Sequence, residues 1–217
     1  MRQLELLLAE EIFDKIVVYG LPSPELPDTS LFFDGRAEIR RPKLVSKSLP
    51  KSLFFQGLKY FEWSFHILRS SMFLPATVVE CHRLSSLPIG LIIKFVKRIK
   101  LIYQTHELET ETHELAGIRK KLFKLLEMTL IRRADAVVVV SDSIADWYEN
   151  RYNIPRPLVI RSIPKVKEST STKSKDCSRK QLGLEPDDIL FSYIGVLSRS
   201  RKIEDLQKLF SKVPSSR

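Results

Sequence analysis

The stretch "DAVVVVSDSIADWYENRY" (residues 135–152) decides the fold class, because it joins a strand pattern directly to a helix pattern. Its first half is a continuous β-branched run, which is typical of a strand that is covered on both faces of its sheet. Its second half has helical periodicity, and Ser141 or Ser143 can cap the start of that helix. A strand followed at once by a helix is the unit from which parallel sheets are built.

The same alternation recurs along the chain. β-Branched runs predict further strands at residues 15–19, 76–81, 100–105, 157–162 and 188–195. Helical patterns predict helices at residues 51–72, 86–98, 114–132, 142–151 and 202–213. The alternation predicts an α/β fold, with a Rossmann-like parallel sheet that has helices on both faces. Residues 21–50 interrupt it, since turn residues and prolines surround a short strand or hairpin edge, and we expect a surface excursion there.

Composition divides the chain into three parts. Residues 1–164 carry most of the strand–helix units, and we expect them to form one Rossmann-like domain. Residues 165–187 are rich in Ser, Thr and Lys, which predicts a linker or a long exposed loop. Residues 188–217 supply one more strand and one more helix, and a single such unit cannot bury both faces of its strand. We therefore expect residues 188–217 to be the start of a second, incomplete domain.

The net charge is the most unusual feature of the composition. The 36 Lys and Arg residues outnumber the 26 Asp and Glu residues and give a net charge of +10, which favours nucleic acid, nucleotide phosphates or anionic lipid as partners. The positive charges are spread along the chain, with several in the linker, and do not line one helix. Nucleic acid is therefore not expected as a partner. Aromatic residues and lysines in 51–69 are compatible with a membrane interface or with a helix that docks on its sheet.

The two cysteines are typical of a cytosolic protein, and the hydropathy pattern predicts no membrane-spanning helix. Cys81 and Cys177 lie far apart without metal-ligand spacing, and we expect reduced thiols. No apolar run reaches the roughly 18 residues of a membrane-spanning helix.

The stretch "LIYQTHELETETHE" (residues 101–114) ends a strand with imidazole and acid. A zinc-protease signature would need a second histidine where Thr110 stands. On a helix, His106 and His113 would lie about 10 Å apart along the axis, whereas a metal–nitrogen bond measures about 2 Å, so no metal site is predicted. The acids suit the first turn of a helix. His106 is either a site residue or a loop residue, since ligands of open parallel sheets bind at the carboxyl ends of the strands.

Phosphate-binding glycine motifs are absent. The chain has 7 glycines and no G-x-G, which disfavours an NAD enzyme or an ATPase, and no cofactor is predicted. A basic loop after Gly195 carries Arg199 and Arg201 towards the start of the last helix. Such a loop either binds phosphate through backbone amides and guanidinium groups or is a solvated basic loop.

Taken in order, these pieces resemble consecutive landmarks of the retaining glycosyltransferases of family four, which have the GT-B architecture. The matching tracts are "TVVECHRLSSLPIGLIIK" (77–94), "KLIYQTHELETE" (100–111), "IRRADAVVVVSDSIADWYENRYNIPRPLVIRSIP" (131–164) and "LFSYIGVLSRSRKIEDL" (190–206). The resemblance implies transfer of a sugar from a nucleotide-sugar donor to a polysaccharide or glycolipid acceptor, with retention and without an essential metal. It departs from the family at Gln104, where aspartate is frequent, and at Lys202, where glycine is frequent.

The resemblance also implies roles for individual residues. It places His106 near the donor sugar and the acceptor, with Glu107 supporting the same loop. It places Ser141 and Asp142 along the cleft. Contacts with the donor diphosphate fall to the two basic residues of the last loop, Arg199 and Arg201.

The resemblance implies that the chain is cut at both ends. The first strand and glycine-containing loop of the family would precede Met1, and the rest of the donor domain would follow Arg217. We therefore expect this chain alone to be a poor catalyst, cytoplasmic and peripheral at the inner face of an anionic membrane. A non-catalytic remnant or interaction partner of a glycosyltransferase, a basic nucleic-acid-binding protein and a metallohydrolase remain as alternatives.

Overall fold

The computed structural model describes residues 2–50, 52–111, 117–161, 163, 179–185, 188–195 and 202–212. The chain divides into two compact units, residues 1–161 and residues 162–217. This division falls close to residue 164, where the sequence predicts the end of the first domain.

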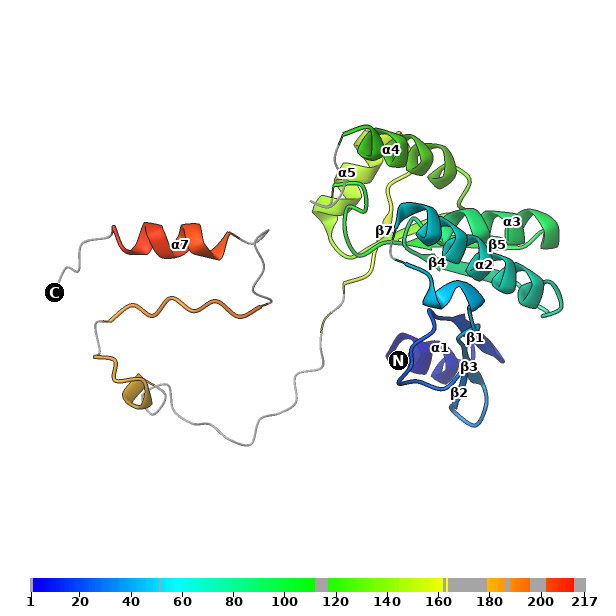
Figure 1. The fold of residues 1–217 in the computed structure, drawn as a ribbon, viewed down its shortest axis with the longest axis horizontal. Coiled ribbons are helices and arrows are strands. Elements are labelled where there is room, and N and C mark those ends of the chain that lie inside the picture. The colour runs from blue at the N-terminus through cyan, green and yellow to red at the C-terminus, as the bar shows by residue number, and fades with distance from the viewer. Residues whose placement is uncertain are drawn as a thin grey trace. The chain divides into compact units, whose positions relative to one another are not determined.

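The first unit contains a parallel sheet of four strands in the order β4-β5-β6-β7 (Figure 1). The strands are β4 (Val78–His82), β5 (Lys100–Gln104), β6 (Ala136–Val139) and β7 (Leu158–Val159). The helices that connect them are α3 (Leu87–Lys97), α4 (Gly117–Ile131) and α5 (Asp142–Tyr152). All three neighbouring pairs are parallel. The α/β class and the Rossmann-like arrangement predicted from the sequence are confirmed.

A second, smaller sheet has the order β1-β3-β2. Its strands are β1 (Ile16–Tyr19), β2 (Thr29–Phe32) and β3 (Ala37–Arg40). β2 and β3 form an antiparallel hairpin, so of the short strand or hairpin edge expected within residues 21–50 the structure has the hairpin. β1 runs parallel to β3. The hairpin turns through Phe33, Asp34 and Gly35, all with positive φ. Asp34 and Gly35 adopt this conformation with less strain than most residues. The sequence does not reveal that β1 pairs within this sheet and not with β4.

Helix α2 (Leu53–Met72) holds the two sheets together, and a short 3-10 helix (Val45–Ser48) precedes it. The Tyr19 hydroxyl at the end of β1 donates to Ser70 Oγ at 2.8 Å. Ile67 belongs to a buried cluster with two isoleucines of α3, and both Tyr19 and Val79 of β4 pack against that cluster. The two sheets therefore share one covering helix within a single unit.

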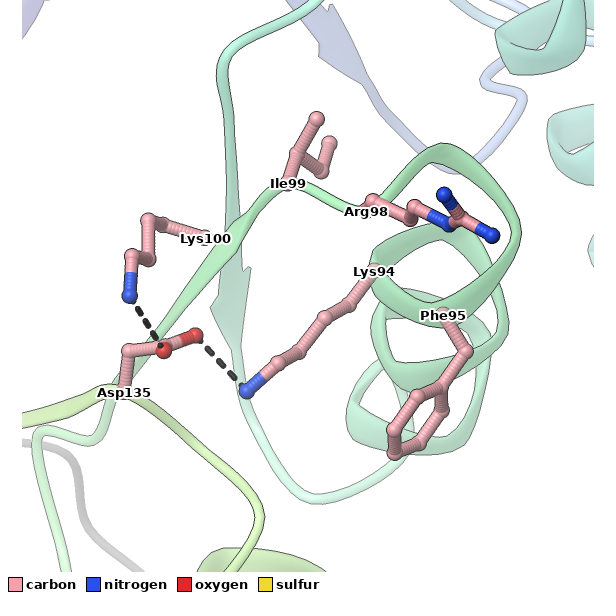
Figure 2. A pocket seen from close by; sticks show the side chains of 6 residues that line it. All are labelled: Lys94, Phe95, Arg98, Ile99, Lys100 and Asp135. Atoms are coloured by element: carbon pink, nitrogen blue, oxygen red, sulfur yellow. Dashed lines mark hydrogen bonds and ion pairs between the residues drawn. The ribbon is translucent and has the colours of Figure 1, made fainter.

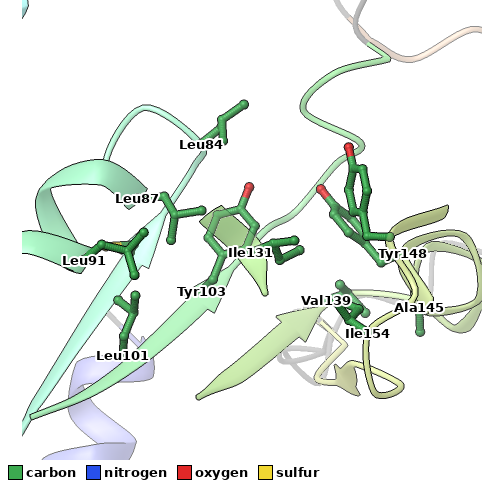
Figure 3. Close-up of a cluster of buried hydrophobic side chains, with 12 residues drawn as sticks. Leu84, Leu87, Leu91, Leu101, Tyr103, Ile131, Val139, Ala145, Tyr148 and Ile154 are labelled. Carbon is green, nitrogen blue, oxygen red and sulfur yellow. The ribbon is translucent and has the colours of Figure 1, made fainter. Parts of the chain in front are cut away.

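The main core lies between the four-stranded sheet and helices α3, α4 and α5 (Figure 3). Its labelled members are Leu84, Leu87, Leu91, Leu101, Tyr103, Ile131, Val139, Ala145, Tyr148 and Ile154. Helix α3 lies very close to the sheet at Gly90, because a Cβ there would clash with Cys81 Sγ and lie 3.0 Å from Leu101 Cδ1. Burial raises the pKa of the free Cys81 thiol to about 11, so the thiol stays protonated. Cys177 lies outside the described residues.

A buried carboxylate joins three elements of this core. Glu127 of α4 is 0% exposed. Three tyrosine hydroxyls donate to it: Tyr103 of β5 to Oε1 at 3.1 Å, Tyr148 of α5 to Oε1 at 2.8 Å, and Tyr152 of α5 to Oε2 at 2.6 Å. Burial, reinforced by this carboxylate, raises the pKa of all three tyrosines, so the phenols remain protonated donors. The carboxylate thus receives three hydrogen bonds in place of its lost hydration.

In the second unit, the structure differs from the strand predicted at residues 188–195. Residues 188–195 have no strand pairing in the part of this unit that is described, whereas helix α7 (Ile203–Phe210) forms as predicted. The rings of Phe191 and Phe210 lie 4.8 Å apart between centroids. An apolar run becomes a strand only where a neighbouring strand satisfies its backbone groups. The alternation pattern alone cannot supply that partner.

Among the described residues, no helix is both long and apolar enough to cross a membrane.

We predict that Gly90→Ala lowers the free energy of unfolding by about 1–3 kcal/mol, because the added methyl group overpacks the contact between α3 and the sheet. Gly57→Ala is the matched control. Gly57 also lies inside a helix, but nothing stands within 4 Å of the position that a Cβ would take there. At Gly57, alanine raises helix propensity and stabilises by about 1 kcal/mol. Urea denaturation measures both changes, and equal effects of the two substitutions would contradict the close packing at Gly90.

We predict that Glu127→Leu destabilises the first unit by about 3 kcal/mol or more, because three buried hydroxyls lose their acceptor at once. Glu127→Gln keeps one acceptor oxygen for two of the tyrosines and offers an amide donor to the third, so a smaller loss is expected. Thermal unfolding of the two variants side by side measures the difference. A leucine variant as stable as the wild type would show that the three tyrosines do not depend on this carboxylate.

Candidate active site at the carboxyl edge of the sheet

The carboxyl ends of β4, β5 and β6 bring several polar side chains to one edge of the parallel sheet. His82, the last residue of β4, lies opposite Gln104, the last residue of β5. The backbone N–H of Thr105 donates to the carbonyl of Val138 in β6 at 2.9 Å. His106 and Ser141 follow these strands directly. They therefore lie at the same edge, as the sequence predicts.

Two histidines stand together at this edge. The rings of His82 and His106 are stacked, with centroids 6.0 Å apart and an interplanar angle of 15°. Both residues are exposed, and His82 Nε2 lies 3.6 Å from the carboxylate of Glu80. A pair of exposed imidazoles can donate and accept hydrogen bonds, which suits the hydroxyl groups of a sugar. Sequence reasoning missed His82, although its position at the end of a strand was the same signal that singled out His106.

Helix α1 (Arg2–Ala9) contributes to the edge through its first turns. Gln3 Nε2 donates to Glu80 Oε1 at 3.1 Å and to Gln104 Oε1 at 3.3 Å. Gln104 is the buried last residue of β5, so its carboxamide lies at the carboxyl edge of the sheet. Gln104, which stands where aspartate is frequent in the family, therefore accepts a hydrogen bond from the side-chain amide of Gln3.

The loop after β5 is fixed by two buried threonines. Thr105 Oγ1 donates to the backbone carbonyl of Glu107 at 2.6 Å. Thr110 is fully buried, and its Oγ1 lies 3.5 Å from the hydroxyl of Tyr152. The side chain of Glu107 is exposed, so the contact that shapes the loop is made by its backbone. A catalytic or supporting role for the Glu107 carboxylate stays a prediction.

Arg83 follows His82 in an uncommon backbone conformation. Its φ is 109°, a region that favours glycine and that costs about 1–3 kcal/mol for other residues. Burial raises the pKa of the half-buried Glu109, and nearby Arg83 opposes that rise. An arginine with a strained backbone next to two exposed histidines is the kind of outlier that accompanies functional sites. The sequence gives no signal for this strain.

The end of β6 carries the predicted helix cap. Ser141 Oγ accepts from the backbone N–H of Ile144 at 3.4 Å, which makes Ser141 the N-cap of α5, and Ser143 Oγ lies 3.1 Å from Ser141 Oγ. Asp142 pairs with Arg161, whose guanidinium lies 2.7 Å from Asp142 Oδ2 and holds the pKa of that carboxyl below its usual range. Arg161 follows β7, so it adds a cation to the same edge. Sequence reasoning did not select it.

The two predicted diphosphate contacts, Arg199 and Arg201, lie outside the described residues, as does His113. Lys202 is described and has φ 51°. This is the left-handed region that glycine adopts without strain, and Lys202 stands where the family frequently has glycine. The lysine thus keeps a glycine-like backbone conformation at the start of α7.

No three His, Cys, Asp or Glu side chains gather as a potential metal site within the described ranges. The edge instead combines two imidazoles, the Asp142–Arg161 pair and amide groups. These groups can bind hydroxyl and phosphate oxygens by hydrogen bonds and charge.

A shallow depression of about 280 Å³ lies at the opposite edge of the sheet (Figure 2). Its lining residues are Lys94, Phe95, Arg98, Ile99, Lys100 and Asp135. Asp135 Oδ2 lies 2.7 Å from Lys94 Nζ and accepts from the backbone N–H of Leu101 at 2.8 Å. The ion pair with Lys94 and the hydrogen bond from the Leu101 backbone lower the pKa of the Asp135 carboxyl. The Asp135 carboxylate joins the start of β5 to the start of β6. This depression is therefore a structural ion-pair site, away from the histidines.

The comparisons with known proteins agree on fold and family. Residues 13–162 match Glycosyltransferase Family 4. Sucrose-phosphate synthase from Thermosynechococcus elongatus has a similar solved structure, with a TM-score of 0.67 and 19% sequence identity over 98% of this chain and 53% of that chain. A second solved chain of that synthase gives a TM-score of 0.53 and 15% identity, over 76% of this chain and 84% of that chain.

A search of curated proteins finds no match to this chain. The chain spans about half the length of the first synthase chain, and at this identity the likeness shows the fold alone. The family match covers most of the chain, including the seven strands found in the described residues and the edge that carries both histidines. The chain therefore belongs to Glycosyltransferase Family 4 and has the fold of a GT-B glycosyltransferase domain.

Proposed function

We propose that this chain forms the acceptor side of a glycosyltransferase that moves a sugar from a nucleotide-sugar donor to a polysaccharide or glycolipid acceptor, with retention of the anomeric configuration. The observation that carries the proposal is the assembly of His82, His106, Ser141 and Arg161 at the carboxyl edge of the parallel sheet. Ligands of open parallel sheets bind at this edge. It lies inside the region that matches the family.

The groups at the edge suit the parts of such a reaction. The two imidazoles can orient hydroxyl groups of the transferred sugar or of the acceptor. The bond that breaks joins the anomeric carbon to a diphosphate, and cations stabilise the negative charge that develops on the departing oxygen. Arg161 supplies one cation from the described unit.

The first test is binding at the edge. Histidine ring signals are followed by nitrogen-edited NMR while UDP-, GDP- and ADP-sugars are added in turn. We expect one donor class to shift His82 and His106 and to leave His66, a partly exposed histidine of α2, unchanged. If no nucleotide sugar moves either edge histidine, the proposed donor site is wrong.

A matched pair of cation variants tests the charge at the edge. Arg161→Ala should weaken nucleotide-sugar binding tenfold or more, because a charge-assisted hydrogen bond contributes about 1.5–3 kcal/mol. Lys100→Ala is the control, since Lys100 also pairs with an aspartate and is similarly exposed, but lies at the opposite edge. Equal losses in both variants would point to general electrostatic attraction rather than to a site.

The second test is turnover. Since the chain spans about half of the synthase chain whose fold it shares, we propose that these 217 residues alone release nucleoside diphosphate slowly or not at all. A coupled assay with the same donor panel and a mixed set of glycan and lipid acceptors measures the release. Sustained release that disappears in His106→Ala would support the site while contradicting the low activity of this chain.

A further inference from the structure

The outer face of α5 carries a row of polar side chains around one tryptophan. A shallow depression of about 510 Å³ lies on this face, and its lining residues all belong to α5: Ser143, Asp146, Trp147, Asn150 and Arg151. They follow the helical spacing of a single stripe, whereas Ala145, Tyr148 and Tyr152 fill the core side of the same helix. From its first to its last residue the stripe extends about 12 Å along the helix axis.

The stripe begins at the candidate active site. Ser141, the N-cap of α5, lies at the carboxyl edge of the sheet, and its Oγ is 3.1 Å from the Oγ of Ser143, where the stripe starts. The stripe therefore leads away from the edge that carries His82 and His106, along the outside of the first unit. A ligand that fills the edge and is longer than one sugar ring can continue along α5.

Trp147 is the one large apolar side chain of the stripe, and its ring is held in place. The ring packs on the main core, with its centroid 5.2 Å from that of Tyr148 and 5.5 Å from that of Tyr152, nearly perpendicular to both. Its indole N–H has no acceptor in the part of the chain that the structure describes. An indole N–H usually finds a partner where it is buried. A fixed ring with an accessible donor is preorganised to bind a ligand.

The polar side chains beside Trp147 also keep unused hydrogen-bonding capacity. Asn150 Nδ2 donates to the backbone carbonyl of Asp146 at 2.7 Å, which leaves the Asn150 Oδ1 as an acceptor. Asp146 uses Oδ1 for its ion pair with Arg156 and keeps Oδ2. Arg151 makes no ion pair or hydrogen bond within the described ranges. The stripe thus offers both donors and acceptors, which is what sugar hydroxyl groups require.

The charge around α5 is balanced, although the whole chain carries +10. Residues 142–161 contain three acids and three arginines. Each acid is paired with an arginine that follows the helix: Asp142 with Arg161, and Asp146 and Glu149 with Arg156. A surface without excess positive charge does not favour nucleic acid or other polyanions.

The apolar content of this face is also low. Every residue of α5 is described, and none is an exposed large hydrophobic side chain. The face therefore lacks the apolar centre that a protein interface has. The ligand that fits is neutral, rich in hydroxyl groups and apolar on one face, which describes a sugar ring.

We propose that the outer face of α5 is a subsite for the acceptor glycan, which binds a sugar unit of the acceptor chain beyond the unit at the edge. The weakly positive C–H groups of a pyranose pack on the electron-rich face of the Trp147 indole. The hydroxyl groups of that sugar bond to Asp146, Asn150 and Arg151. This inference rests on the proposed transfer to a glycan, and it selects an acceptor with several linked sugars, since only such a chain reaches both the edge and Trp147.

The indole N–H signals in nitrogen-edited NMR test the subsite on the 217-residue chain. The chain has two tryptophans, and the second is a built-in control, because the indole N–H of Trp63 donates to the carbonyl of Gly20 at 3.3 Å. Oligosaccharides of the α-glucan, β-glucan, mannan and galactan types are added in turn. We expect one type to shift the indole signal of Trp147 and to leave that of Trp63 unchanged.

Variants measured by titration calorimetry test the contacts. Trp147→Ala should weaken oligosaccharide binding tenfold or more, and Trp147→Phe should weaken it less, because phenylalanine keeps an aromatic face and the packing on the core. Arg151→Ala should weaken binding severalfold without disturbing the core, since Arg151 is exposed. Its matched control is Arg69→Ala, which removes an exposed arginine of α2 and should bind like the wild type. Circular dichroism checks that each variant is folded.

The subsite is wrong if no oligosaccharide shifts Trp147, or if Arg151→Ala and Arg69→Ala bind alike. A steep loss of binding with added salt would also contradict it, because a neutral ligand is not held by charge. The donor site is read separately, from nucleotide sugars at His82 and His106. A response of the histidines without any response of Trp147 would overturn the subsite and leave the proposed function standing. A response of Trp147 alone would support the subsite and count against the donor site.

Discussion

The buried carboxylate of Glu127 is the interaction on which the main domain depends. It lies on α4, and the three hydroxyls that donate to it come from β5 and α5. One side chain therefore fixes how two helices sit against the central strand. Tyr103 immediately precedes Gln104, so the same hydrogen bonds also hold the end of β5, where the loop with His106 begins. An apolar residue in place of Glu127 could fill the volume, but it could not orient three phenols.

Close packing below the sheet and polar groups at its edge are consequences of the same topology. Gly90 allows α3 to lie against β4 and β5, which sets the separation of the helix layer from the sheet. Because the strands are parallel, their ends reach one edge, and each following loop begins there. His82 and His106 stack for this reason, although they are separated by a complete helix and strand in the sequence. The edge is thus a product of the fold rather than of any short motif.

The sequence predicted the parallel sheet, the connecting helices and the edge position of His106 and Ser141, because these depend on local periodicity and on the rule that places strand ends together. It did not predict that β1 would pair outside the main sheet. Nor did it predict that, within the part of the second unit that is described, residues 188–195 would have no strand partner, because the local pattern does not contain the partner that completes a strand. Arg161 was missed for a similar reason. Its neighbour Asp142 is nearly twenty residues away in sequence, and only the parallel arrangement of β6 and β7 brings the two together.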